Sequence, residues 1–543
     1  MKQWTKLFIG IGALVWIGCA DETTVYDNGD ENDPFIIENG SNPTSAVSFK
    51  ASGVLRLTGR SLPMSPADTT AGDYPLTLVA SIIPPTREDG SIFTASHVDV
   101  EGDFAYVSYN TAGDVYEGAV DIINISDPNN PTVSSRLIYR NADVNAVYFD
   151  GGFLYAVGSV DSETSASAIS NSFVARIPSM GGVLETDGII YGFQQGYNAT
   201  GVVSRPDRLL VSSGKEGSIV AYSKTDLSVL SEIFVADARS LAPSATGVAV
   251  LDAGSGVRML ESDLTESNLI PVSSDLGEES KKTLDTWDAW VIVAEGANGA
   301  GIYEASTGTL VQNLPIPSVP AGVDSQYVVT NAVSVNENAI FMANGGAGLS
   351  LAEREGSGAT TMGTIELDGS VNYVVSQDDF AFAASGSNGL HIIKLNRPAD
   401  SLDTRYLDLP LYEGKSRLIV DSGTAAAFRG SKSLEQVTVD GSLRLSGSWT
   451  VHEDVTVAPN GRLELLGKMA VGRNDGRKQI VVGSGATLIV EGSLIIYGDL
   501  ILKEGATIEF LGSGAVADVF GQVRQEGDAS IQGAFRDVRG AFK

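Results

Sequence analysis

Short runs of apolar residues alternate with polar ones from about Tyr74 to Pro398, and Gly, Asn, Asp and Ser interrupt them every few residues. A period of two with such interruptions predicts β-strands joined by tight turns. One unit recurs, in which an apolar strand is followed by a glycine-containing loop and then by a second strand. It occurs at residues 209–222, 248–260, 291–304, 340–352 and 382–395. The pattern predicts a repeat architecture built from strands.

The glycine that opens the second strand gives the period of this repeat. It falls at Gly217, Gly256, Gly301, Gly348 and Gly389, with spacings of 39, 45, 47 and 41 residues. Two earlier units fit the same frame with longer loops and have Gly118 and Ser172 at this position. Seven units of about 45 residues, each with about four short strands, predict a seven-bladed β-propeller. Residues 76–82 precede the first unit and match its outer strand, so we expect them to complete the last blade and remove an open sheet edge.

The most complete unit, GAVDIINISDPNNPTV at residues 118–133, strongly resembles the LVIVD repeat, a propeller blade family of bacterial surface and secreted proteins. GLHIIKLNRP at residues 389–398 is a weaker copy. The resemblance implies a propeller over residues 74–400 and supports this architecture better than any activity.

After a poorly patterned stretch, predicted as a linker over residues 401–430, the period changes. Glycines at 441, 461, 485 and 505 are spaced 20, 24 and 20 residues apart among alternating apolar residues. One coil per repeat predicts a parallel β-solenoid over residues 431–543; it resembles the small β-helical segments of secreted bacterial proteins related to pectate-lyase-like folds. The predicted fold class is therefore all-β, a seven-bladed β-propeller followed by a small parallel β-solenoid. Residues 53–59 match residues 441–447 closely, which predicts a strand that docks on the solenoid.

The start of the chain has the pattern of a leader sequence. Lys2 and Lys6 precede a 12-residue apolar run at 7–18, which is too short to span a bilayer as a helix. Trp16-Ile17-Gly18-Cys19 resembles the lipobox of bacterial lipoproteins, which implies a signal peptide over residues 1–18 and lipidation of Cys19. The alternative is a free cysteine after an ordinary signal peptide. Residues 19–73 are predicted to be an acidic tether, and the acidic residues after Cys19 look like signals that direct some Gram-negative lipoproteins to the outer face of the outer membrane.

Charge and composition exclude several function classes. The chain has 36 Lys and Arg against 67 Asp and Glu, a formal net charge of −31, which disfavours nucleic acid as a partner. With one Cys and three His, an intrachain disulfide is excluded and no structural zinc, other metal or cofactor is expected. The nucleophile, metalloprotease and phosphate-loop motifs are missing in a suitable context. His97, His391 and His452 lie singly in apparent strands, and Asp143 and the pair Asp378-Asp379 lie in predicted turns, so structural roles are expected.

One polar position recurs through the repeat frame, eight residues before the first apolar residue of the second strand. It would open each innermost strand and line one mouth of the central channel, and the seven residues are candidates for ligand binding. They are Ser96, Asn145, Thr200, Arg239, Lys282, Asn331 and Asn372. The alternative interpretation is that they cap strand ends in a water-filled channel.

Together these patterns favour a surface lipoprotein that acts as a non-enzymatic binding or scaffold module, with its membrane contact through Cys19 and an unknown protein or glycan as ligand. A hydroxyl-rich or anionic ligand would suit amides beside Arg239 and Lys282. The first alternative is an enzyme acting on polysaccharide, which would need two carboxylates about 5–9.5 Å apart in the channel. The second is self-assembly, in which the last solenoid coil stacks on a neighbouring copy unless residues 532–543 cover it.

Overall fold

The computed structural model describes residues 35–40, 46–59, 70–396 and 407–543, apart from positions 112, 114, 164, 166, 273, 278–280, 318, 337 and 338. The described residues contain many strands, one 3-10 turn, η2 (Ser325–Tyr327), and no α-helix. The expected all-β class is confirmed. The predicted signal peptide over 1–18 and Cys19 lie outside the described residues.

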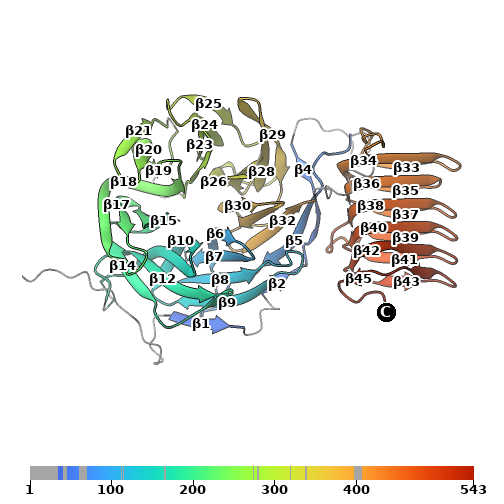
Figure 1. Cartoon of the computed structure of the whole chain (residues 1–543), viewed down its shortest axis with the longest axis horizontal. Helices are drawn as coiled ribbons and strands as arrows, with labels where there is room; N and C mark the ends of the chain where they lie inside the picture. Colours follow the sequence, from blue (N-terminus) through green and yellow to red (C-terminus); the bar gives the residue numbers. More distant parts are fainter. Residues whose placement is uncertain are drawn as a thin grey trace, which may run out of the picture.

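The N-terminal module is a β-propeller, with sheets arranged radially about a central axis (Figure 1). Its strands form six hydrogen-bonded sheets, because the long strand β18 (Val229–Pro243) is shared by two groups of four strands. Divided at β18, the sheets correspond to the seven repeat units of the sequence.

Each group of strands runs from the axis outward, and we name it after its innermost strand. The first three groups are β6 (Thr94–Glu101), β7 (Phe104–Asn110), β8 (Gly118–Asn124) and β9 (Thr132–Tyr139); β10 (Ala142–Asp150), β11 (Phe153–Val160), β12 (Ser172–Met180) and β14 (Ile190–Gln194), with β13 (Val183–Leu184) beside β12; and β15 (Ala199–Ser204), β16 (Leu209–Ser213), β17 (Lys215–Tyr222) and the first half of β18. The next three are the second half of β18, β19 (Gly247–Asp252), β20 (Gly256–Glu261) and β21 (Glu266–Ile270); β22 (Leu284–Trp287), β23 (Trp290–Ala294), β24 (Ala300–Glu304) and β25 (Leu310–Leu314); and β26 (Val328–Asn336), β27 (Ala339–Gly345), β28 (Leu349–Glu355) and β29 (Gly358–Ile365).

The last group closes the ring with a strand from the other end of the repeat region. β30 (Tyr373–Gln377), β31 (Phe380–Ala384) and β32 (Leu390–Leu395) are completed by β5 (Leu76–Ile82), which pairs antiparallel with β32. This confirms the predicted role of residues 76–82. Leu76 and Leu78 pack into the core shared with the β26 sheet, while Val79 and Ile82 pack into the core shared with the β6 sheet.

The segment predicted as an acidic tether over 19–73 is structured in its described part, which corrects that interpretation. β1 (Phe35–Asn39) extends the edge at β9, β2 (Val47–Ser48) and β3 (Gly53–Leu55) pair with β5, and β4 (Leu57–Thr58) pairs with β29. These strands form because outer strands of the propeller offer them unpaired edges, and apolar residues such as Phe35 and Val54 are buried.

The frame of the repeat needs one correction. Gly256, Gly348 and Gly389 have positive φ, and a Cβ on each would lie 1.9 to 2.3 Å from a carbonyl oxygen of the outer strand. In the β22 sheet this environment belongs to Gly299, with φ of 84° and Leu314 O at 2.0 Å, rather than to Gly301. The unit AEGANGAGIYE contains three glycines, and spacing alone could not tell which of them meets the outer strand.

The C-terminal module is a parallel β-solenoid of about six coils, as predicted (Figure 1). One face has β33 (Arg417–Val420), β35 (Gln436–Val439), β37 (Val455–Val457), β39 (Gln479–Val482), β41 (Asp499–Leu502) and β43 (Val523–Gln525). The other has β34 (Ala425–Leu434), β36 (Ser442–Val451), β38 (Arg462–Val471), β40 (Thr487–Ile496), β42 (Thr507–Val519), β44 (Ser530–Gln532) and β45 (Arg536–Asp537). The first coil thus begins within residues 401–430, where a linker was predicted. Its strands, β33 and β34, are held by the ladder of the next coil rather than by their own weak alternation.

Both ends of the solenoid core are covered by aromatic residues. At the C-terminal end, Phe535 stacks on Phe510 with 4.0 Å between ring centroids, and Phe542 packs against both. At the other end, Tyr412 packs edge-on against Phe428 and Trp449. This covering disfavours assembly by stacking the last coil on a neighbouring copy.

The segment from 46 to 59 joins the two modules. Val54 N donates to Gly472 O at 2.8 Å while its own strand β3 pairs with β5, and its side chain packs against Ala470 and Tyr497 of the solenoid. The predicted strand at residues 53–59 therefore contacts the solenoid, but its ladder belongs to the propeller.

Further bonds join the modules, one within this segment and one after it. Arg56 makes two hydrogen bonds to Glu435, at 2.7 and 3.1 Å, and Gly72 and Ser433 exchange backbone hydrogen bonds of 2.9 and 2.7 Å. These contacts connect the propeller and the solenoid directly, in addition to the covalent chain.

Candidate functional site

The seven polar residues predicted at the channel mouth, here called the polar ring, occupy equivalent positions in successive groups of strands. Ser96, Asn145, Thr200, Arg239 and Asn331 lie near the start of innermost strands, while Asn372 directly precedes β30 and Lys282 lies two residues before β22.

Each side chain of this ring donates to the repeat unit that follows it. The bonds are Ser96 to Val144 O (3.0 Å), Asn145 to Ala199 O (3.3 Å), Thr200 to Ala238 O (2.7 Å), Arg239 to Gly277 O (3.0 Å), Lys282 to Asn331 Oδ1 (3.2 Å), Asn331 to Val371 O (3.5 Å) and Asn372 to Ala95 O (3.4 Å). The last bond returns to the first sheet, and the bond of Arg239 reaches the loop before β22 rather than a strand.

These hydrogen bonds explain why polar residues occupy the ring position even without a ligand. Buried polar groups need partners, and a hydrogen bond to the neighbouring sheet contributes about 1 kcal/mol to stability. Ser96, Arg239 and Lys282 are buried between sheets, with 6%, 7% and 2% of their surface exposed. The contacts favour a structural role for the ring, and a role in ligand binding stays a prediction.

Next to the polar ring, the channel contains titratable side chains that the sequence repeat did not identify. A cavity of about 120 Å³ is lined by the innermost strands and contains His97, Asp99, Lys281, Asp285 and Tyr373. Asp99 accepts from Phe149 N at 2.7 Å and Asp285 accepts from Val335 N at 2.9 Å, each across a sheet boundary. The sequence repeat could have identified the two aspartates, because Asp99 and Asp285 each lie three residues after a ring residue, Ser96 and Lys282.

Lys281, which precedes β22, reaches the innermost strands of the first two sheets. Its ammonium donates to Ser96 O at 2.6 Å and to Asn145 O at 3.1 Å, and it lies 4.9 Å from the ring centroid of Tyr373. The same Tyr373 ring stacks on His97 with 3.9 Å between centroids. Burial lowers the pKa of Lys281 to about 7, and burial followed by the charge of Lys281 lowers the pKa of His97.

The two channel carboxyl groups have the opposite shift, which gives a testable pH dependence. Burial raises the pKa of Asp99 to about 7 from an ordinary value near 3.8. The folded state therefore binds the proton more tightly, and its stability falls as pH rises from about 4 to about 7. Asp99→Asn removes this loss while keeping an acceptor for Phe149 N, so the variant should be more stable than the wild type at pH 8, by up to about 4 kcal/mol, and similar to it at pH 4.

Denaturant unfolding at both pH values measures this difference, with Asp440→Asn, an exposed solenoid turn residue, as the control. An equal gain for the two variants at pH 8, or a gain of Asp99→Asn that does not depend on pH, would contradict the assignment.

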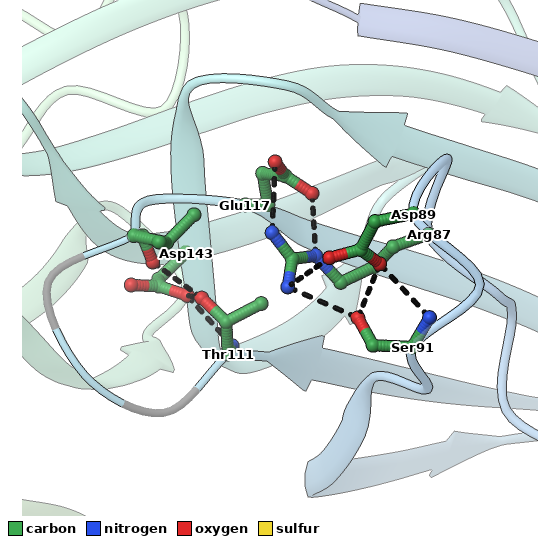
Figure 2. Close-up of polar contacts among 7 residues, drawn as sticks. Arg87, Asp89, Ser91, Thr111, Glu117 and Asp143 are labelled. Carbon is green, nitrogen blue, oxygen red and sulfur yellow. Dashed lines mark hydrogen bonds and ion pairs between the residues drawn. The ribbon is translucent and has the colours of Figure 1, made fainter.

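Beside the polar ring, a second set of polar side chains connects the loops of the first two sheets (Figure 2). Arg87 holds both carboxylate oxygens of Glu117, at 2.7 and 3.1 Å, and Asp89 accepts from the Ser91 hydroxyl at 2.6 Å. Asp143 accepts from the backbone N and the hydroxyl of Thr111, at 2.8 and 3.0 Å, and burial raises its pKa to about 6. Asp143 is thus a buried strand residue rather than the turn residue predicted. Since each carboxylate already has donors, the cluster is suited to fixing loops.

The other two histidines have structural partners, as expected. His391 bonds Ser81 Oγ through Nδ1 at 2.8 Å and the carbonyl oxygen of Asp368 through Nε2 at 3.0 Å. His452 contacts Ser433 Oγ at 3.0 Å beside the junction of the two modules, where burial lowers its pKa to about 4.

Known structures with a similar arrangement are propellers. The chain is similar to the WD40 repeats of RRP9 (TM-score 0.44, 10% identity, covering 58% of this chain and 96% of that one), to the WD40 β-propeller domain of Doa1 (0.42, 11%, 59% and 97%) and to BamB from Moraxella catarrhalis (0.38, 12%, 64% and 97%). No protein family matches the sequence, and no curated protein matches it either.

Two further findings concern the described part of the chain. It contains no group of three or more His, Cys, Asp or Glu side chains arranged to hold a metal ion. None of its helical segments has the length and apolar character needed to cross a bilayer.

Proposed function

We propose that this protein is a lipid-anchored, non-enzymatic binding scaffold of the bacterial cell surface, with a propeller related to the LVIVD repeat proteins. The observation that carries the proposal is the hydrogen-bonded junction of the two modules. A flexible linker would suffice for two independent domains, whereas here residues 46–59 bond to both the propeller and the solenoid, and residues 70–73, which lead into β5, bond to the solenoid. A fixed junction creates a fixed cleft, and clefts between domains are a common place for ligands.

The contacts of the acidic side chains favour binding over hydrolysis. An enzyme acting on polysaccharide needs one carboxyl group free to donate a proton and another free to attack or to activate water. Asp99 and Asp285 instead hold backbone N–H groups of neighbouring sheets, and Glu117 is held by Arg87.

Affinity electrophoresis in gels containing neutral or acidic polysaccharides, combined with a reducing-end assay, tests the proposal. We expect at least one polymer to retard the purified protein without release of reducing ends. Release of reducing ends would overturn the non-enzymatic proposal, and equal mobility in every gel would overturn glycan binding.

Anchoring makes a separate prediction. Cys19→Ala should release the protein from the membrane fraction of intact cells, because acyl chains on Cys19 supply the apolar contact that the proposal requires. Fractionation after a salt wash measures the release, and Ser41→Ala, farther along the same N-terminal region, is the control. A variant that stays fully with the membrane would show that the lipoprotein proposal is wrong.

A further inference from the structure

The cavity in the propeller channel has a wall to which every repeat unit contributes. One lining residue from each of the seven groups of strands is His97, Tyr148, Thr200, Ser240, Asp285, Ser334 and Tyr373. Its volume of about 120 Å³ is close to that of an engineered cavity of about 150 Å³ that holds benzene. The cavity therefore has room for an occupant of about six heavy atoms or for a cluster of water molecules.

The charged side chains of this wall already have partners in the protein. Asp99 and Asp285 hold backbone N–H groups of the neighbouring sheets, and Lys281 holds two backbone carbonyl oxygens. Burial also disfavours charge on all three, because it raises the pKa of both carboxyl groups and lowers the pKa of Lys281. An ionic ligand would have to compete with these backbone groups for the same side chains.

Other polar atoms of the wall have no partner. Ser240 Oγ and His97 Nδ1 are buried and make no hydrogen bond to any residue that the structure describes, and Ser240 is only 6% exposed. The hydroxyl of Tyr373, whose ring stacks on His97, also makes no hydrogen bond within the described part of the chain. Buried polar groups are nearly always paired, so unpaired ones around a single cavity indicate that its occupant forms hydrogen bonds.

The unpaired groups differ from the charged ones in their hydrogen-bonding type. A serine or tyrosine hydroxyl both donates and accepts, and a neutral imidazole has one donor and one acceptor nitrogen. Burial, followed by the charge of Lys281, lowers the pKa of His97, which favours the neutral ring. Hydroxyl groups complement such a set, because they also donate and accept, whereas an ammonium only donates and a carboxylate only accepts.

We propose that the channel cavity binds a small neutral polyol of the size of glycerol or erythritol. Its hydroxyls bond Ser240, His97 and Tyr373, and the side chains of Leu241 and Val375, which line the same cavity, contact its carbon chain. A serine hydroxyl can turn toward such a ligand by changing its χ1 rotamer. This site goes beyond the proposed surface-binding function, because a polyol inside the channel involves neither the lipid anchor nor the junction of the modules.

Ligand-observed saturation-transfer NMR on the full chain tests this site, with glycerol, erythritol and two charged analogues of glycerol as probes. Glycerol or erythritol should bind. Glycerate and 3-aminopropane-1,2-diol, which carry a negative and a positive charge at pH 7, should each bind at least about tenfold more weakly than glycerol, because a charge in the cavity loses its water without gaining a free partner.

Two variants remove one hydroxyl each and change the shape of the wall very little. Tyr373→Phe and Ser240→Ala should each weaken polyol binding about fivefold, the loss expected for one neutral hydrogen bond. The matched control is Tyr327→Phe, since Tyr327 in η2 is 60% exposed and does not line the cavity, and this variant should bind like the wild type.

Four outcomes would overturn the proposal. If the wild type binds neither polyol, the cavity holds water alone. If Tyr373→Phe and Ser240→Ala bind the polyol as tightly as the wild type, the polyol lies elsewhere. If either charged analogue binds as tightly as glycerol, the site does not select a neutral ligand. If both variants melt at a lower temperature than the wild type without polyol, their hydroxyls have structural partners, whereas unpaired hydroxyls can be removed without loss of stability.

Discussion

Replacing Leu76–Ile82 with seven Gly and Ser residues should abolish cooperative folding of the propeller or lower its stability by most of its total. β5 is the outer strand of the last sheet, and four of its large apolar side chains, Leu76, Leu78, Val79 and Ile82, are at most 4% exposed. At about 1.5–3 kcal/mol for each buried side chain, the loss is about 6–12 kcal/mol. A net stability of about 5–15 kcal/mol leaves little after such a loss.

The matched control is the same replacement of Phe35–Asn39. β1 also adds an outer strand by antiparallel pairing, but within it Phe35 is the one fully buried residue, at 3% exposure, so we expect a loss of at most about 3 kcal/mol. Thermal unfolding followed by circular dichroism, with size-exclusion chromatography to detect aggregation, distinguishes the two. If both replacements lower the melting temperature equally, β5 does not have the closing role that its pairing indicates.

The success of this prediction from sequence has a simple physical origin. A propeller blade needs four strands, and the unit that ends at residue 395 contains three, so the pattern demanded a fourth strand from elsewhere. Residues 76–82 have the required alternation and copy the outer strand of the first unit. The pairing could be inferred because β32 needs a partner strand at its open edge and the apolar segment 76–82 needs a place where it is buried.

The N-terminal strands could not be inferred in the same way. β2, β3 and β4 have two or three residues each, too few to show a period. They are strands because the outer edges at β5 and β29 hold them, and this is a tertiary effect. The first solenoid coil was missed because the alternation of its strands is weak and the ladder of the next coil holds them.

The polar ring shows what the sequence repeat can predict and what it cannot. The frame correctly placed polar residues such as Asn145 and Asn372 at equivalent positions, but it could not show whether their side chains turn toward the axis or toward the next sheet. The repeat also gave no reason to single out Lys281, which lies one residue before the ring residue Lys282, because no other unit was found to have an equivalent lysine there. A sequence repeat predicts where a residue lies along the backbone of its strand. The direction of its side chain depends on which neighbouring group can accept its hydrogen bond.

A second ladder of glycines, inside the solenoid strands rather than at the corners used to find the period, allows a sharp test of the stacking. Gly430, Gly447, Gly467 and Gly492 lie in register in successive coils. Gly447 has φ of 109°, and a Cβ on it would lie 2.1 Å from Gly430 O, a contact that only a shift of the coil above could relieve.

Gly447→Ala should therefore destabilise the protein by about 3 kcal/mol or more, because strain at positive φ adds to overpacking against rigid backbone. Gly430→Ala is the control, since Gly430 also has a positive φ, of 155°, but its Cβ would meet no atom closer than Lys432 Cγ at 3.5 Å; its cost should be smaller than that of Gly447→Ala by the overpacking contribution, about 1–3 kcal/mol. Urea unfolding of the two variants gives the comparison. The in-register ladder requires the interior glycine to be the more costly one to replace, so equal losses would show that the coils are not stacked at this spacing.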